Sequence, residues 1–129
     1  MICVDTSVWI AALGDATGAG ALHLAELVDA NVVAVPAPVR VEILAGAPRR
    51  AFADLVDGFL GITQFVPGGP TWELVEHWVR EAVAAGQRFG VVDLLIAATA
   101  AEHGATLWSL DADFARMQKL GFVQLYASP

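Results

Sequence analysis

The sequence predicts an α/β domain in which a parallel sheet lies between two layers of helices. Three observations support this three-layer architecture. Short runs that are apolar on consecutive residues alternate with longer stretches of helical periodicity. The short runs lack the strict apolar and polar alternation of a half-exposed strand, as expected for parallel strands covered on both faces. No repeat, low-complexity tract or long linker divides the sequence, so we expect a single domain over residues 1–129.

The first half of the chain is predicted to alternate between short strands and short helices. Its apolar runs, interpreted as strands, are 2–4, 31–35 and 62–66. Its stretches of helical periodicity are 8–13, 23–29, 39–45 and 50–59. Ser7 directly precedes the first of these helices and is a suitable N-cap for it.

The second half contains the two clearest helical patterns. One begins at Thr71, the expected N-cap, and its apolar positions recur every three or four residues until Gly86 ends the helix. The other, 92–103, is apolar on nearly every side, which predicts a central buried helix. The remaining predicted elements are strands over 106–110 and 122–126 and a short helix over 113–120.

The charge balance restricts the ways in which this chain binds other molecules. Its formal net charge is −7, which argues against tight non-specific binding of nucleic acid through a basic face. A polyanionic substrate would therefore need a counter-cation. Cys3 is the only cysteine, which excludes an intrachain disulfide and a cysteine-based zinc site. The absence of a basic leader and of an apolar run of about 20 residues predicts a soluble, cytoplasmic protein without a membrane contact.

Acidic residues follow the predicted strands or begin the buried helix. They are Asp5, Glu42, Asp93, Asp111 and Asp113. Because ligands bind at the carboxyl ends of parallel strands, these side chains are expected to converge. Each one also has a structural interpretation, as a turn or helix cap or as a charge favoured by a helix dipole.

Three of these acids, Asp5, Glu42 and Asp93, are flanked by apolar residues, which predicts burial. A buried carboxylate costs several kcal/mol unless a cation or hydrogen bonds compensate. One shared divalent cation would compensate all of them, and ligands that are all oxygen favour Mg²⁺ or Mn²⁺ over zinc. The histidines, His23, His77 and His103, lie on three different predicted helices without metal-ligand spacing and are interpreted as structural.

Four segments, taken in order, resemble the PIN-domain nucleases and specifically the VapC-type toxins of prokaryotic toxin–antitoxin pairs. They are VDTSVW at 4–9, VEILAG at 41–46, VDLLIAATA at 92–100 and LDADF at 110–114. The resemblance covers essentially the whole chain. It implies a five-stranded parallel sheet, an endoribonuclease that depends on Mg²⁺ or Mn²⁺, and inhibition by a cognate VapB-like antitoxin.

The resemblance also assigns roles by position. Asp5, Glu42 and Asp93 match the invariant acids of that family, and Thr6 or Ser7 matches the hydroxyl that helps hold metal or water. Asp5 and Asp93 are the expected direct metal ligands. Glu42 and a fourth acid are expected to complete the site directly or through water.

The fourth acid is either Asp111 or Asp113. Asp111 is favoured because it lies nearer the strand end, which leaves Asp113 as a helix cap or an outer group of the site. Arg88, just before the buried helix, is the arginine expected to contact the RNA substrate. Four tryptophans and a long apolar helix in a small domain predict a homodimer. The antitoxin is expected to place a basic segment over the acidic site.

Two alternative functions compete with the ribonuclease. A Mg²⁺-dependent phosphohydrolase of the haloacid dehalogenase type also has an aspartate after its first strand. It normally needs a second aspartate two residues later and a lysine near the site, whereas this chain has Ser7 at that position and Lys119 as its only lysine. The other alternative is a non-catalytic module whose acidic pocket docks a basic partner.

Overall fold

Four parallel strands form the sheet of the computed structural model, which describes residues 1–129. β1 (Ile2–Val4) lies inside the sheet, between β2 (Val33–Pro36) and β4 (Thr106–Trp108). β3 (Thr63–Phe65) pairs with the other side of β2, so the strand order is β3-β2-β1-β4. The carboxyl ends of all four strands therefore lie at the same edge of the sheet.

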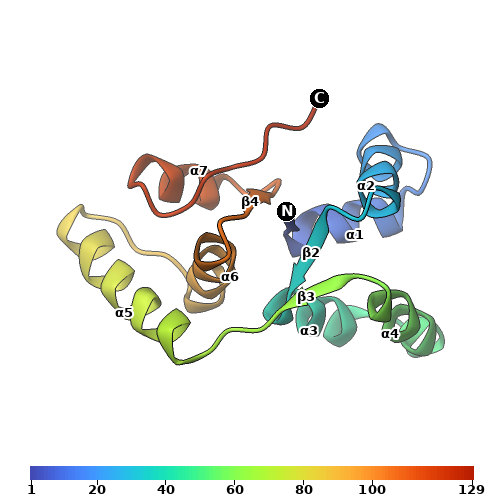
Figure 1. Cartoon of the computed structure of the whole chain (residues 1–129), viewed down its shortest axis with the longest axis horizontal. Coiled ribbons are helices and arrows are strands. Elements are labelled where there is room, and N and C mark those ends of the chain that lie inside the picture. Colours follow the sequence, from blue (N-terminus) through green and yellow to red (C-terminus); the bar gives the residue numbers. More distant parts are fainter.

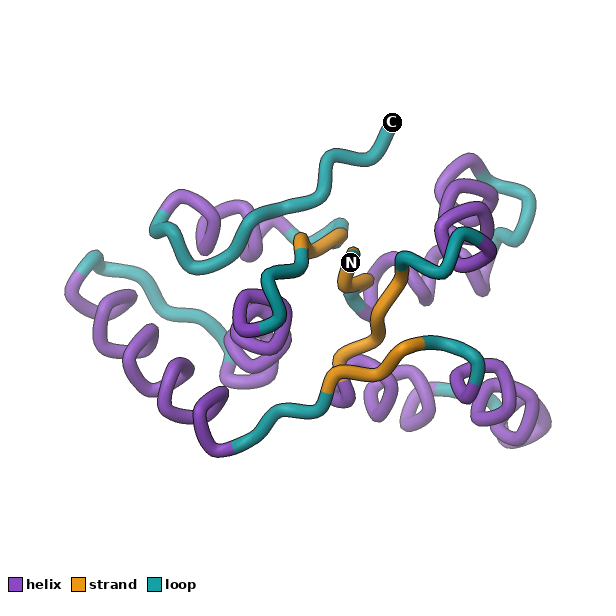
Figure 2. Tube along the Cα trace, in the orientation of Figure 1, coloured by secondary structure: helices purple, strands orange, loops and turns teal.

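Helices occupy most of the remaining chain and surround the short strands (Figure 2). They are α1 (Thr6–Gly14), α2 (Ala19–Asp29), α3 (Ala37–Gly46), the 3₁₀ helix η1 (Arg49–Ala51), α4 (Phe52–Leu60), α5 (Gly69–Ala84), α6 (Val91–Glu102) and α7 (Ala112–Lys119). Figure 1 shows α1 to α4 on one side of the strands, at the right of the view, and α5 to α7 on the other. No helix combines the length and the apolar composition needed to cross a membrane.

Successive strand residues point to opposite faces of the sheet, and in β1 and β4 they belong to two different apolar cores. Cys3 and Leu107 belong to the larger core, which includes residues of α3, α5, α6 and α7. Val4 and Trp108, each the next residue along its strand, belong to a smaller core formed with α1 and α2. Both faces of the sheet are thus covered, which confirms the three-layer arrangement predicted from the consecutive apolar runs.

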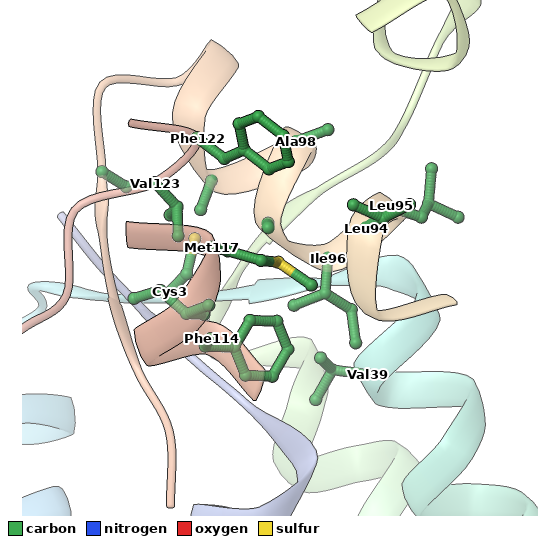
Figure 3. Close-up of a cluster of buried hydrophobic side chains, with 14 of the residues drawn as sticks. Cys3, Val39, Leu94, Leu95, Ile96, Ala98, Phe114, Met117, Phe122 and Val123 are labelled. Carbon is green, nitrogen blue, oxygen red and sulfur yellow. The ribbon is translucent and has the colours of Figure 1, made fainter. Parts of the chain in front are cut away.

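α6 lies at the centre of the larger core, as the sequence predicted. Residues 94–100 of this helix are all buried. In Figure 3, Ile96 of α6 lies among Phe114 and Met117 of α7 and Cys3 of β1. Because the rest of the helix is packed on all sides, the first turn of α6 is held at the edge of this core.

The prediction of a fifth strand over 122–126 is wrong. In this segment only Leu125 forms a bridge, parallel to Leu107 of β4. The bridge is closed by two hydrogen bonds, from the Leu107 amide to the Gln124 carbonyl at 2.9 Å and from the Tyr126 amide to the Leu107 carbonyl at 2.8 Å. The segment therefore lies along the outer side of β4 without extending the sheet by a full strand.

The segment over 122–126 is also tied to the end of α7. The Phe122 amide donates to the Met117 carbonyl at 3.1 Å, and Gly121 adopts a φ of 80°, a combination that closes the helix. The Leu125 amide then donates to Gln118 Oε1 at 2.7 Å. The segment is thus held against α7 as well as against β4.

Two predicted helix caps also differ from the structure. Asp5, and not Ser7, is the N-cap of α1. α5 begins at Gly69, before the predicted N-cap Thr71. Pro70 fits the first turn, because amides at the start of a helix have no partner within the helix and proline has no amide hydrogen to leave unbonded. Thr71 instead lies inside the helix, where its Oγ1 accepts a hydrogen bond from the Gly68 amide at 2.9 Å.

Candidate metal centre

Asp5 is a buried carboxylate at the carboxyl end of β1, with only 5% of its surface exposed. Its amide continues the strand ladder by donating to the Trp108 carbonyl at 2.9 Å. Its Oδ2 accepts hydrogen bonds from Ser7 Oγ and Ser109 Oγ, both at 2.8 Å, and a longer one from the Ser7 amide at 3.4 Å. These donors replace the water that burial removes, and they leave Oδ1 without a hydrogen bond.

Ser109 joins the end of β1 to the loop after β4. Besides donating to Asp5, Ser109 Oγ accepts from the Asp111 amide at 3.0 Å. Ser7 Oγ makes a second link by accepting from the Leu110 amide at 3.0 Å. Ser109 escapes prediction because the apolar run extends to residue 110, whereas β4 ends at Trp108. The signal available in the sequence was a hydroxyl residue, Ser109, two positions before Asp111.

Glu42 lies in α3 and is hydrogen-bonded to the first residue of α1. Thr6 Oγ1 donates to Glu42 Oε1 at 2.9 Å. The predicted burial of Glu42 is wrong, because the residue is exposed and its neighbour Val41 is 64% exposed. Successive residues of a helix point in directions about 100° apart, so only Ile43 of this apolar stretch turns into the core.

Asp93 lies in the first turn of α6 and is half-buried. Burial, followed by the negative charges of nearby acids, raises the pKa of its carboxyl from 3.8 to about 6. Those acids, in decreasing order of effect, are Asp111, Asp5, Asp113 and Glu42. The structure therefore brings all five predicted acids into one electrostatic cluster around Asp93.

Three of the five acids lie close enough to share one cation. Ligand oxygens of Asp93, Asp111 and Asp113 are all within 4.8 Å of one another. Asp5 and Glu42 lie outside this closest set and act on Asp93 through their charge. A group made only of carboxylate oxygens fits Mg²⁺ or Mn²⁺, and a divalent cation would relieve the repulsion that raises the pKa of Asp93.

Asp111, and not Asp113, takes the role of helix cap that the sequence suggested for Asp113. Asp111 is the N-cap of α7, since its Oδ1 accepts from the Asp113 amide at 2.9 Å. The expected cap, Asp113, instead accepts a hydrogen bond on Oδ1 from Arg116 at 2.7 Å. The Asp113–Arg116 pair has the three-residue spacing of a helix ion pair, a signal present in the sequence.

The other arginines near the acids in sequence do not pair with them. Arg40 donates to Gln64 Oε1 at 2.9 Å and not to Glu42. Arg88 is exposed and forms no ion pair. Its contact with RNA stays a prediction. Asp5, Glu42, Asp93 and Asp111 thus have no lysine or arginine partner.

The three histidines have partners outside the acidic cluster. His23 Nε2 lies 2.8 Å from the Tyr126 hydroxyl, and His77 Nε2 lies 3.1 Å from Glu81 Oε1. His103 Nδ1 lies 2.7 Å from the Thr99 carbonyl. Cys3 is fully buried, and burial raises the pKa of its thiol to about 12. None of these side chains adds a nitrogen or sulfur ligand to the three grouped carboxylates.

Both the sequence and the fold are similar to those of known proteins. Residues 2–120 match the PIN domain family. The fold is similar to VapBC2 from Rickettsia felis bound to a promoter DNA fragment, with a TM-score of 0.80, 22% identity and 98% of each chain covered. It is also similar to DNA-bound VapBC from Salmonella typhimurium, with a TM-score of 0.79, 15% identity and coverage of 97% of this chain and 96% of that one.

A third similar structure is VapC20 of Mycobacterium tuberculosis, described as a toxin that cleaves the sarcin–ricin loop. The two share 24% identity and a TM-score of 0.69, over 98% of this chain and 100% of that one. None of the curated proteins compared with the sequence matches it. Because the sequence identities to these structures are 22%, 15% and 24%, the structural similarity shows a shared fold and no more.

The raised pKa of Asp93 predicts how pH affects the stability of the metal-free protein. Because the folded state binds this proton more tightly than the unfolded state, the contribution to stability is complete below the unfolded pKa of 3.8 and is lost as pH rises through about 6. Asp93→Asn removes the titrating group. Urea unfolding in chelator should show that the stability of Asp93→Asn relative to the parent rises between about pH 4 and pH 7.

The matched control is Asp57→Asn, which removes an exposed carboxylate from α4, away from the five clustered acids. Its stability relative to the parent should stay level over the same pH range. Identical pH profiles for the two variants would contradict the assigned electrostatics.

Proposed function

The chain belongs to the PIN domain family, and on this basis we propose that it is a metal-dependent endoribonuclease of the VapC type, the toxin of a toxin–antitoxin pair. One observation carries the proposal. Asp93, Asp111 and Asp113 present ligand oxygens within 4.8 Å of one another. Asp5 lies beside them at the end of β1, and its charge acts on Asp93. The fold shared with VapC proteins supports the same assignment.

The proposed cation is Mg²⁺ or Mn²⁺. Asp5 and Asp93 are the proposed direct ligands, with Glu42 and Asp111 completing the set directly or through water. When bound, the cation would supply the Lewis-acid chemistry that activates water and stabilises negative charge in phosphodiester hydrolysis. The phosphate charge of the RNA would thereby be met locally, even though the whole chain carries a net charge of −7.

The hydroxyls near the site orient carboxylates. Thr6 Oγ1 donates to Glu42, and Ser7 Oγ donates to Asp5, so the hydrogens of both hydroxyls are already used within the protein. Ser109 supports Asp5 in the same way. With Oδ2 held by two serines, the free Oδ1 of Asp5 is the oxygen available to a cation.

The two alternative functions have less support. Membership of the PIN domain family does not favour a phosphohydrolase of the haloacid dehalogenase type. Ser7, in place of that family's second aspartate, donates a hydrogen bond to Asp5. A non-catalytic acidic docking module would share the cluster, and it differs from a nuclease only in lacking RNA cleavage.

A VapB-like antitoxin is the proposed partner, because several structures similar to this chain are VapBC complexes. We propose that its basic segment binds over the acids and blocks access of the cation or its water. Arg88 stays the proposed contact to RNA.

RNA cleavage tests the proposed enzyme directly. The chelator-stripped protein should be inactive on a panel of transfer, ribosomal and messenger RNAs. Mg²⁺ or Mn²⁺ should restore cleavage and yield 5′-phosphate and 3′-hydroxyl ends. Asp93→Asn should lower the rate by at least about 100-fold, because it removes a proposed metal ligand. Asp57→Asn, at an exposed position of α4, is the control and should cleave like the parent.

Two outcomes would separate the alternatives from this proposal. Cleavage that persists in chelator or in Asp93→Asn would exclude the assigned site. Hydrolysis of a phosphomonoester without RNA cleavage would favour the phosphohydrolase.

Competition between a basic peptide and magnesium tests the proposed mode of inhibition. A synthetic peptide that carries two arginines should bind the chain, since an arginine fork can bind both oxygens of a carboxylate. Added Mg²⁺, added salt and the Asp93→Asn change should each weaken its affinity. An affinity that responds to none of these three would place the basic segment elsewhere on the surface.

A homodimer is the proposed assembly, because large apolar side chains remain exposed on α5. Trp72, Val79 and Val83 are 50%, 41% and 45% exposed. Sedimentation velocity at micromolar concentration should give the mass of two chains. A single monomeric species under these conditions would overturn the dimer without affecting the proposed chemistry.

A further inference from the structure

Arg116 is the only arginine or lysine that forms an ion pair, and its partner is an acid of the candidate site. Its NH2 group donates to Asp113 Oδ1 at 2.7 Å. Its NH1 group donates to Gln87 Oε1. Its guanidinium carbon lies 4.6 Å from the centre of the Phe89 ring. The guanidinium is therefore held by three side chains at once.

These contacts come from two separate parts of the chain. Asp113 lies in the first turn of α7, whereas Gln87 and Phe89 lie in the segment between α5 and α6. Phe89 is itself packed edge-on against Phe122, with ring centres 6.4 Å apart. An arginine fork that is stacked on an aromatic ring and hydrogen-bonded on both sides loses little further freedom on pairing, so the contact with Asp113 is pre-organised.

The neighbouring acid Asp111 has no such partner. Its Oδ1 caps α7 by accepting from the Asp113 amide, and its side chain contacts no arginine or lysine. A guanidinium keeps its positive charge at all physiological pH values. A cation that bound Asp113 would share one carboxylate with this fixed positive charge, whereas a cation that bound Asp111 would not.

All three acids of the closest set, Asp93, Asp111 and Asp113, are near enough to share a cation, but only Asp113 is paired with an arginine. We propose that Arg116 is a positioning residue that withholds Asp113 from the metal, so that Asp111 acts as the fourth acid of the site. This inference rests on the proposed metal-dependent function and deepens it. Arg116 selects between two acids that sequence position alone does not distinguish. By joining α7 to the segment before α6, it also fixes Asp113 relative to the start of the helix that carries Asp93.

Calorimetric titration of the full chain with Mn²⁺ tests the proposal without relying on activity. In the parent, Asp111→Asn should weaken Mn²⁺ affinity at least about tenfold, and Asp113→Asn should change it less than about threefold. Arg116→Met frees Asp113 and should strengthen Mn²⁺ binding. In the Arg116→Met background, Asp113→Asn should then weaken binding at least about tenfold, which is the coupling that a double-mutant cycle measures.

Two further variants separate this coupling from general charge or folding effects. Lys119→Met removes one positive charge from the same helix without touching Asp113, and it should leave the effect of Asp113→Asn below about threefold. Arg116→Lys keeps a cation beside Asp113 and should preserve the small effect of Asp113→Asn. Circular dichroism checks that each variant is folded, and Arg116→Gln, which also removes the positive charge, replaces Arg116→Met in the comparison if the latter is not.

The outcomes distinguish the inference from the function on which it rests. If the parent fails to bind Mn²⁺, the proposed metal-dependent function fails. If the parent binds Mn²⁺ but Asp113→Asn weakens binding as much as Asp111→Asn, only the role of Arg116 is overturned. An effect of Asp113→Asn that is the same with and without Arg116 overturns it as well.

Discussion

Parallel pairing of β1 with strands on both of its sides is the constraint on which the site depends. β1 comes first in the chain, yet it lies between β2 and β4. The ladder between β1 and β4 continues into Asp5, whose amide bonds to the Trp108 carbonyl at 2.9 Å. Because the strands run in one direction, the segments that follow them lie at the same edge of the sheet. Acids from distant parts of the sequence therefore meet there.

The structure balances this gathered negative charge in a different way for each acid. Hydroxyls hold the buried Asp5, while Glu42 stays exposed and accepts from Thr6. Asp113 has an arginine, and Asp93 has a raised pKa because burial and its acidic neighbours oppose its ionisation. Asp111 retains a carboxylate without a cationic partner. These differences make the acids chemically unequal before any cation binds.

Much of the architecture was predictable from local sequence patterns. Consecutive apolar residues predicted strands covered on both faces, and the two cores on either side of β1 confirm it. The apolar composition of α6 predicted a central helix, and residues 94–100 are buried. The absence of a full fifth strand was not predictable from its apolar residues, because the Phe122 amide is used in closing α7. Competing hydrogen-bond partners of this kind do not alter hydrophobicity.

The sequence by itself determined the fold class and which acids follow the strands, because both depend on residue order and local periodicity. Only the tertiary structure decided what each acid contacts. Ser109 lies 104 residues from Asp5 and Arg116 lies 29 residues from Gln87, yet each pair is hydrogen-bonded. Burial likewise differed between two acids with similar apolar neighbours, Asp5 and Glu42. Hydrogen bonding, burial and charge interaction depend on distance in space, and that distance is set when the strands pair and the helices pack.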